Sequence, residues 1–269
     1  MSKRLVFFGN ERLVSGLARS QTPILQGLIE CGYDIAAVVV NHTDARSRNA
    51  RTLEVADIAA AHGIPVISPD RPGDIEQQLR NLQADAAILA AYGRIIPQRI
   101  IDVFAPIGII NIHPSLLPRH RGSTPIESTI LQGDSEAGVS IMQLSAGMDE
   151  GPVYGQVSLT LRGDETKFEL HDELAVHGAE LLFELLPGIL DGTVTAKPQG
   201  NNGVSYTTMI QKQDGIVDPS TETADEVVRK IRAYLGFPKT RLHYKNADVI
   251  LTAANGKSMS GAAYLRGLR

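Results

Sequence analysis

The stretch GIINIHPSLLPRHRG, residues 108–122, holds the densest chemistry in the 269-residue sequence. An apolar run at 107–110, typical of a buried strand, leads to Asn111, and His113 lies two positions further on. Because Pro114 keeps His113 out of the helical region, we expect this segment to be extended. Asn111 and His113 then point the same way from the end of a strand. Such an amide and imidazole could bind a developing oxyanion and move a proton.

The residues after His113 predict a basic turn and an acidic loop. The turn, 115–122, is too rich in Pro and Gly to continue a strand. Pro125 is expected to begin a short helix that ends near Gly133, and a strand at 139–144 follows. The next loop carries Asp149 between two glycines. A carboxylate there could orient His113 or favour its charged form. For Asn111 and His113 by themselves, the alternative is a solvated loop after a buried strand.

The first 111 residues alternate short apolar runs with helical segments. The expected strands are 5–8, 35–40, 65–67, 86–90 and 108–111, and the expected helices are 22–32, 52–62, 74–82 and 98–103. Continuous apolar strands separated by helices predict an α/β fold, Rossmann-like, with a mostly parallel sheet covered on both faces. Ligands of such sheets bind at the carboxyl ends of strands, where Asn111 and His113 lie. Without GxGxxG or a P-loop, we expect neither a dinucleotide nor ATP.

The second half of the chain predicts a return strand, a long helix and a separate tail. A strand at 153–161 is expected to pair with 139–144, and a long amphipathic helix should run over 167–186 and end near Pro187. Residues 193–207, rich in Gly, Asn and Thr, indicate a linker. A further helix is expected at 225–234.

Composition favours a cytoplasmic protein that binds a polyanion. No apolar run is long enough to span a membrane, and one cysteine, Cys31, excludes an internal disulfide framework. The histidines are scattered, so no metal site is expected. Residues 229–269 contain nine Lys and Arg against one acidic residue, whereas the rest has 17 basic and 29 acidic residues. This asymmetry predicts a basic module for a polyanion, with a merely basic surface as the alternative.

Several motifs resemble one enzyme family. NIHPSLLPRHRG, followed by GMDEGP at 147–152, is similar to the signature of formyltransferases that use 10-formyltetrahydrofolate. RGSTPIE, GVSIMQL and GMDEGP most resemble methionyl-tRNA formyltransferases. The resemblance implies a formyltransferase domain over 1–192 with Asn111, His113 and Asp149 as its catalytic triad. It also implies initiator methionyl-tRNA as the formyl acceptor, and we expect a monomer.

The resemblance also implies binding residues for both substrates. The implied folate-binding residues lie in two loops: Ala90, Ala91, Tyr92, Gly93, Ile95, Ile96 and Pro97, then Ser115, Leu116, Leu117 and Pro118. The candidates for tRNA binding are basic: Arg46, Arg48, Arg51, Arg121, Lys239, Arg241 and Lys245.

The tail departs from the family pattern. YTTMIQKQDGIVDPS at 206–220 and NGKSMSGAAYLRGLR at 255–269 resemble the start and end of the family's second domain. The residues between them are too few for its five-stranded barrel, so 208–269 is expected to form a reduced tRNA-binding domain with a few strands on a helix. Two alternatives are a sugar-nucleotide N-formyltransferase and a non-catalytic folate- or RNA-binding relative.

Overall fold

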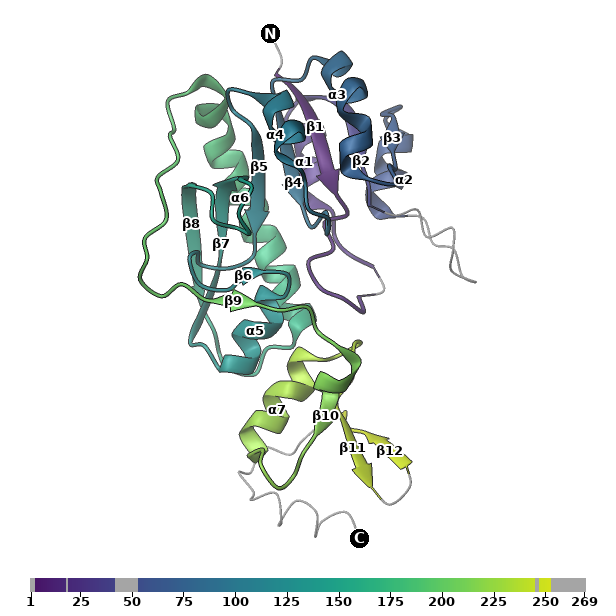
Figure 1. Ribbon diagram of the computed structural model, residues 1–269, viewed down its shortest axis with the longest axis vertical. Helices are drawn as coiled ribbons and strands as arrows, with labels where there is room; N and C mark the ends of the chain where they lie inside the picture. Colours follow the sequence, from purple (N-terminus) through teal and green to yellow (C-terminus); the bar gives the residue numbers. More distant parts are fainter. Residues whose placement is uncertain (1–2, 18, 42–52, 245–246, 253–269) are drawn as a thin grey trace.

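The computed structural model describes residues 3–17, 19–41, 53–244 and 247–252 (Figure 1). Its centre is a seven-stranded sheet with the order β3-β2-β1-β4-β5-β7-β8. The strands are β1 (Arg4–Gly9), β2 (Asp34–Val39), β3 (Val66–Ile67), β4 (Ala86–Ala90), β5 (Ile109–His113), β7 (Glu136–Gln143) and β8 (Val153–Thr160). The first five in this order are parallel, and β7 and β8 are antiparallel to their neighbours. The predicted mostly parallel α/β sheet, and the pairing of the return strand, are confirmed.

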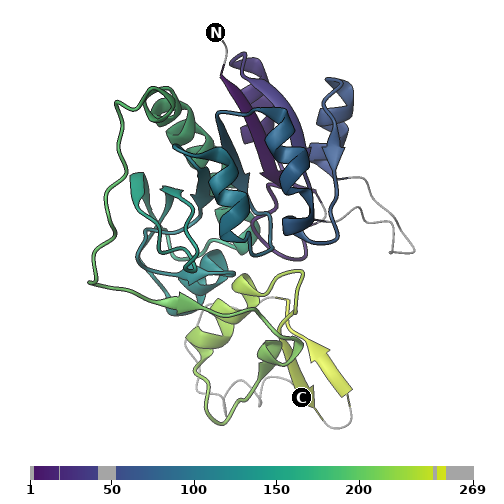
Figure 2. The same cartoon turned by 45° about the horizontal axis from the view of Figure 1, so that its top comes forward.

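Helices cover both faces of this sheet (Figures 1 and 2). Along β1, Leu5 and Phe7 belong to one apolar core, whereas Val6 and Phe8 belong to the other. The strands therefore lack a polar face, which explains their continuous apolar runs. One core is closed by α1 (Pro23–Glu30), α2 (Glu54–Ala61), α5 (Pro125–Gln132) and α6 (Lys167–Asp191), and the other by 3-10 turns at Pro72–Ile75 and Asp102–Phe104, α3 (Glu76–Leu82) and α4 (Gln98–Ile101). Within the described residues no helix is long and apolar enough to cross a membrane.

The prediction that the long helix ends near Pro187 is wrong. Helix α6 continues through Pro187 to Asp191 and ends at Gly192, whose φ of 81° lies in the left-handed region. A proline inside a helix costs about 3 kcal/mol. Ile189 and Leu190 are buried in the core beyond it, and each contributes roughly 1.5–3 kcal/mol. Burial of the last turn therefore offsets the proline.

The switch point of the sheet lies between β1 and β4, because the chain leaves these neighbouring strands towards opposite edges. Gly9 closes β1 with a φ of 129°, and a Cβ there would lie 1.8 Å from the Ala90 carbonyl oxygen. Only glycine allows this approach of the two strand ends. A ligand site at the carboxyl edge is thus centred on residues that follow β1 and β4.

The tail packs as a small module below the seven-stranded sheet in Figure 1. Its elements are a 3-10 turn at Lys212–Gly215, β10 (Ile216–Val217), α7 (Ala224–Ala233), β11 (Arg241–Tyr244) and β12 (Ala247–Ile250). Strand β9 (Tyr206–Thr207) precedes this module and pairs with β6 (Arg121–Gly122). Strands β10, β11 and β12 form a three-stranded sheet whose buried residues, including Val217 and Leu242, cluster with Val227 and Ile231 of α7. The described part of the tail therefore has a few strands on a helix, as its length predicted.

Basic residues of α7 attach the tail to the domain built on the seven-stranded sheet. Arg229 Nε donates to the Leu131 carbonyl at 3.0 Å, and Arg232 donates to the Glu165 carbonyl at 3.0 Å. Lys230 pairs with Glu222 within the tail, at 2.7 Å. Part of the positive charge that indicated a polyanion site therefore serves docking.

Glu11 provides a test of how burial controls the fold. It is buried beyond β1, and its carboxylate accepts hydrogen bonds from the amides of Ile24 and Leu25 at the start of α1, at 3.0 and 2.8 Å. Burial outweighs these hydrogen bonds and raises the pKa of Glu11 from 4.5 to about 7. The folded state therefore binds the proton more tightly than the unfolded state does. The contribution of Glu11 to the free energy of unfolding is therefore fully present below pH 4.5 and is lost as pH rises through 7.

We therefore expect Glu11→Gln to flatten the dependence of unfolding free energy on pH. In the unmodified protein this one group should lower that free energy by about 3 kcal/mol between pH 4.5 and 7, because one pKa unit corresponds to about 1.4 kcal/mol. Urea unfolding of both proteins at several pH values measures the difference. If the unfolding free energies of the two proteins depended equally on pH, the raised pKa of Glu11 would be contradicted.

Candidate active site

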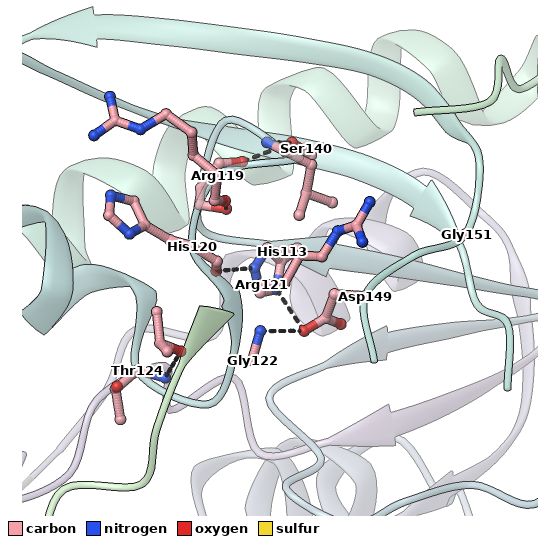
Figure 3. Close-up of polar contacts among 12 residues, drawn as sticks. His113, Arg119, His120, Arg121, Gly122, Thr124, Ser140, Asp149 and Gly151 are labelled. Atoms are coloured by element: carbon pink, nitrogen blue, oxygen red, sulfur yellow. Dashed lines mark hydrogen bonds and ion pairs between the residues drawn. The ribbon is translucent and has the colours of Figure 1, made fainter. Parts of the chain in front are cut away.

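His113 ends β5 in a buried position between two oxygen atoms (Figure 3). Its Nε2 lies 3.0 Å from the carbonyl oxygen of His120, and its Nδ1 lies 3.7 Å from Oδ2 of Asp149. Because a carbonyl oxygen can only accept, Nε2 carries a proton. The Nδ1 to Oδ2 distance is too long for a hydrogen bond but suits an ion pair. Nδ1 therefore keeps its hydrogen-bonding capacity for another group.

Asp149 is held next to His113 by the turn that follows β5. Its Oδ2 accepts a hydrogen bond from the amide of Gly122 at 2.8 Å. The backbone of Asp149 is left-handed, with a φ of 51°. This conformation costs a non-glycine residue roughly 1–2 kcal/mol. The surrounding contacts must therefore hold the loop in place.

Asn111 adds hydrogen-bond donors to the same strand end. It is buried in β5 between β4 and β7, where it lies opposite Leu89 and Met142. It precedes His113 by two residues and therefore shares its face of the sheet. No residue in the described part of the chain hydrogen-bonds its side-chain amide. A fixed donor that no protein group uses can bind an oxyanion.

This geometry agrees with comparisons to known proteins. A family model described as formyl transferase matches residues 10–186. The methionyl-tRNA formyltransferase of Halorhodospira halophila is 36% identical over 257 residues, which cover 94% of this chain and 80% of that protein. That of Chloroflexus aggregans is 38% identical over 234 residues, covering 86% and 75%. The chain belongs to the methionyl-tRNA formyltransferase family.

A solved structure supports the fold assignment. The N-formyltransferase from Helicobacter canadensis, solved with folinic acid and dTDP-3-aminofucose, matches with a TM-score of 0.68. It is 20% identical, and the match covers 93% of this chain and 87% of that protein. At this identity the likeness shows the fold alone.

The first loop that the formyltransferase resemblance assigned to folate turns its larger side chains mostly inwards. Tyr92 and Ile96 are buried in the core, and Tyr92 packs edge-on against Phe8 with ring centroids 5.4 Å apart. Ile95, in contrast, is 84% exposed. Ala91 and Gly93 have φ values of 52° and 74°, so the backbone reverses sharply after Ala90, and Pro97 precedes α4. A ligand here would meet backbone groups and Ile95.

The second loop lies against β7 rather than open to solvent. The Ser140 hydroxyl donates to the Ser115 carbonyl at 2.6 Å and accepts from the Leu117 amide at 3.1 Å. Leu116 packs on Gly138, where a Cβ would lie 2.4 Å from it. Pro118 accepts a hydrogen bond from the Ser205 amide at 3.3 Å. Ser140 of β7 therefore holds the turn that follows His113 in place through two hydrogen bonds. The sequence analysis did not identify Ser140.

The basic residues implied for tRNA have different environments. Arg121 is buried, and its guanidinium donates hydrogen bonds to Gln199 and Tyr206, so its donors are used within the protein. Arg241 donates to the Lys212 carbonyl at 2.7 Å, and Lys239 is exposed. The remaining four candidates lie outside the described residues: Arg46, Arg48, Arg51 and Lys245.

A second histidine supports the site and was also missed. His120 Nε2 lies 2.7 Å from Oδ2 of Asp134, and Arg119 binds the other oxygen of Asp134 at 2.7 Å. These contacts fix the residue whose carbonyl accepts from His113. Its proximity to Asp134 arises only when the turn folds back over α5, so no local pattern could have identified it.

The carboxyl edge of the sheet has unused polar atoms that fit an organic ligand. Asn10 follows β1, Asn41 follows β2 and Tyr92 follows β4, and each has a buried side-chain oxygen without a partner in the described part of the chain. Buried polar atoms normally find hydrogen-bond partners. Among the described residues no group of three His, Cys, Asp or Glu is placed to hold a metal ion.

Proposed function

We propose that this chain transfers a formyl group from 10-formyltetrahydrofolate to the amino group of methionyl-initiator tRNA, the step that prepares this tRNA for translation initiation. One observation carries the proposal: Asn111, His113 and Asp149 lie together at the carboxyl edge of the sheet. They do so in a chain that is 36% identical, along 94% of its length, to a methionyl-tRNA formyltransferase.

The site suits attack of an amine on a formyl carbon. The tetrahedral intermediate carries an oxyanion, towards which the Asn111 amide and Nδ1 of His113 would donate hydrogen bonds. Asp149 would stabilise the imidazolium and keep the ring in place, and could assist water-mediated removal of the amine proton. The new C–N bond forms as the bond to the folate nitrogen breaks, and that nitrogen takes a proton. This scheme needs neither a covalent enzyme intermediate nor a metal.

The folate donor would lie at the carboxyl ends of β1 and β4. The side-chain oxygens of Asn10 and Asn41, which have no partner among the described residues, and the backbone reversal after Ala90 offer hydrogen bonds to a planar ring with donors and acceptors. The Helicobacter canadensis N-formyltransferase, which has the same fold, was solved with folinic acid, which supports a folate as the formyl donor.

The acceptor tRNA would approach along the tail. The positive charge of residues 229–269 contrasts with the acidic remainder of the chain, which alone would repel a polyanion. Lys239 is the exposed candidate within the described tail, and α7 holds that tail against the catalytic domain. Arg121, in contrast, is omitted from the proposed tRNA surface because protein acceptors occupy it.

A sugar-nucleotide N-formyltransferase is the second candidate. The match to the Helicobacter canadensis enzyme covers 93% of this chain with a TM-score of 0.68, so an enzyme of this class has a fold of comparable extent. Sequence identity favours the tRNA substrate, at 36% against 20%. A purely binding relative would not need Asn111, His113 and Asp149 in this arrangement.

One assay separates the three functions. The full chain is incubated with 10-formyltetrahydrofolate and either initiator methionyl-tRNA or a dTDP-amino sugar, and formylated product is measured. We expect transfer to the tRNA, with an apparent affinity that falls as salt increases because phosphate contacts release counterions. Transfer to the sugar alone would establish the second candidate. No transfer to either would favour the non-catalytic relative.

A further inference from the structure

The segment expected to be a linker, 193–207, contacts the loop 149–151, which contains Asp149. Gln199 Nε2 donates hydrogen bonds to the carbonyls of Asp149 and Gly151, at 2.7 and 2.8 Å. Its Oε1 accepts from Nε and a terminal nitrogen of Arg121, at 3.1 and 2.8 Å. Because a guanidinium only donates and a carbonyl only accepts, these partners determine which way the amide points. Both ends of the Gln199 amide are thus engaged.

Arg121 and Tyr206 complete a ring of contacts around this loop. Arg121 donates to the Tyr206 hydroxyl at 2.9 Å, and that hydroxyl donates to Oε1 of Glu150 at 2.6 Å. Strand β9, which contains Tyr206, pairs with β6 (Arg121–Gly122). Residues 149–151 are therefore held from the linker side at each position.

Asp149 requires such support. Its backbone is left-handed, with a φ of 51°, and among the described residues the carboxylate accepts one hydrogen bond, from the Gly122 amide. A conformation that the residue itself disfavours persists only where surrounding contacts hold it. Loss of the Gln199 hydrogen bonds would leave two carbonyls free to turn and would let the carboxylate move away from His113.

Ser205 holds His120, whose carbonyl oxygen is the second partner of the His113 ring. Its hydroxyl accepts a hydrogen bond from the His120 amide at 2.9 Å, and its carbonyl accepts from the Arg121 amide at 2.9 Å. The His120 carbonyl is the group that binds Nε2 of His113. The same segment thus fixes the oxygen atoms on both sides of the imidazole.

We propose that Gln199 and Ser205, two residues of the segment 193–207, are positioning residues for formyl transfer. The inference rests on the proposed function for its assay, but its geometric basis is independent of the acceptor. Misplacement of a reacting group by about 1 Å can reduce rate about a hundredfold. Removal of the Gln199 donors should therefore lower kcat much more than it raises KM for folate.

The principal test is Gln199→Glu in the full chain. This change keeps the size and the Arg121 contact but places an oxygen against the two carbonyls. We expect kcat to fall about ten- to a hundredfold, with KM for 10-formyltetrahydrofolate within about twofold of the starting protein. Asn202→Asp, which adds the same charge at an exposed position of the same segment, is the matched control and should keep kcat.

Two further measurements distinguish positioning from a general loss of structure. In an Asp149→Asn background, Gln199→Glu should add little further loss, because both changes act through one group. The nitrogen chemical shifts of the His113 ring should change in Gln199→Glu as in Asp149→Asn, but not in Asn202→Asp. This NMR result needs no acceptor, so it stands or falls apart from the proposed function. Gln199→Met removes the donors without adding charge and replaces Gln199→Glu if that variant is unfolded.

Unchanged kcat in a folded Gln199 variant would overturn the proposal. Fully additive losses with Asp149→Asn, or unaltered His113 shifts, would do the same. Ser205→Ala tests the second positioning residue, because it removes the hydroxyl that accepts from the His120 amide. It should lower kcat and leave KM for 10-formyltetrahydrofolate unchanged.

Discussion

Replacing His113 with alanine should lower kcat for formyl transfer about a hundred- to a thousandfold, which is the usual effect of losing one oxyanion donor. The reason is geometric: His113 is held between the His120 carbonyl and Asp149, so that Nδ1 can donate as negative charge develops. In the proposed mechanism these interactions strengthen in the transition state, so KM for the folate donor should change little. Steady-state kinetics with 10-formyltetrahydrofolate and methionyl-tRNA measures both constants.

A matched histidine provides the control for this prediction. His177 lies on α6 with a half-exposed side chain, and its one ion pair within the described part of the chain is with Glu180, one helical turn away. His177→Ala should retain kcat, whereas Asn111→Ala and Asp149→Asn should resemble His113→Ala. Near-normal turnover in a folded His113→Ala protein would exclude the proposed mechanism.

Replacing Lys167 with methionine should destabilise the protein by about 3–5 kcal/mol, the usual cost of leaving a buried charge without its partner. The side chains of Lys167 and Glu127 are 0% and 2% exposed and lie 3.5 Å apart. Lys167 also donates to the Phe237 carbonyl at 3.0 Å, so the pair joins the catalytic domain to the tail. Burial raises the pKa of Glu127 and lowers the pKa of Lys167, in both cases against the attraction between them. Urea unfolding at pH 7 measures the loss.

The double variant Glu127→Gln, Lys167→Met tests whether the charge is responsible. Replacing both partners of a buried pair is often close to neutral, so most of the lost stability should return. In Lys167→Met alone, the raised pKa of Glu127 means that the folded state holds the proton more tightly. The deficit should therefore shrink as pH falls towards 4.5. A loss below about 1 kcal/mol at pH 7, or no recovery in the double variant, would contradict this account.

Local patterns in the sequence predicted most elements of the catalytic domain. The apolar runs that became β1 and β4 are buried on both faces, so their composition alone indicated a covered parallel sheet. Pro125 marked the start of α5, which begins at that residue. The extended backbone at His113 followed from Pro114, because the steric conflict involves neighbouring residues only. Asn111 and His113 could therefore be placed at one strand end without a structure.

The support around these residues came only from tertiary contacts. The segment containing Gln199 has the composition of a linker, and nothing nearby in the chain shows that its amide lies on the carbonyl of Asp149, 50 residues away. Arg229 and Arg232 were counted as charge for a polyanion, yet they donate to carbonyls of the catalytic domain. Pro187 signalled a helix end, but burial of the next turn offset its cost. In each case free energy from contacts between distant segments outweighed a local preference, and local sequence does not encode that quantity.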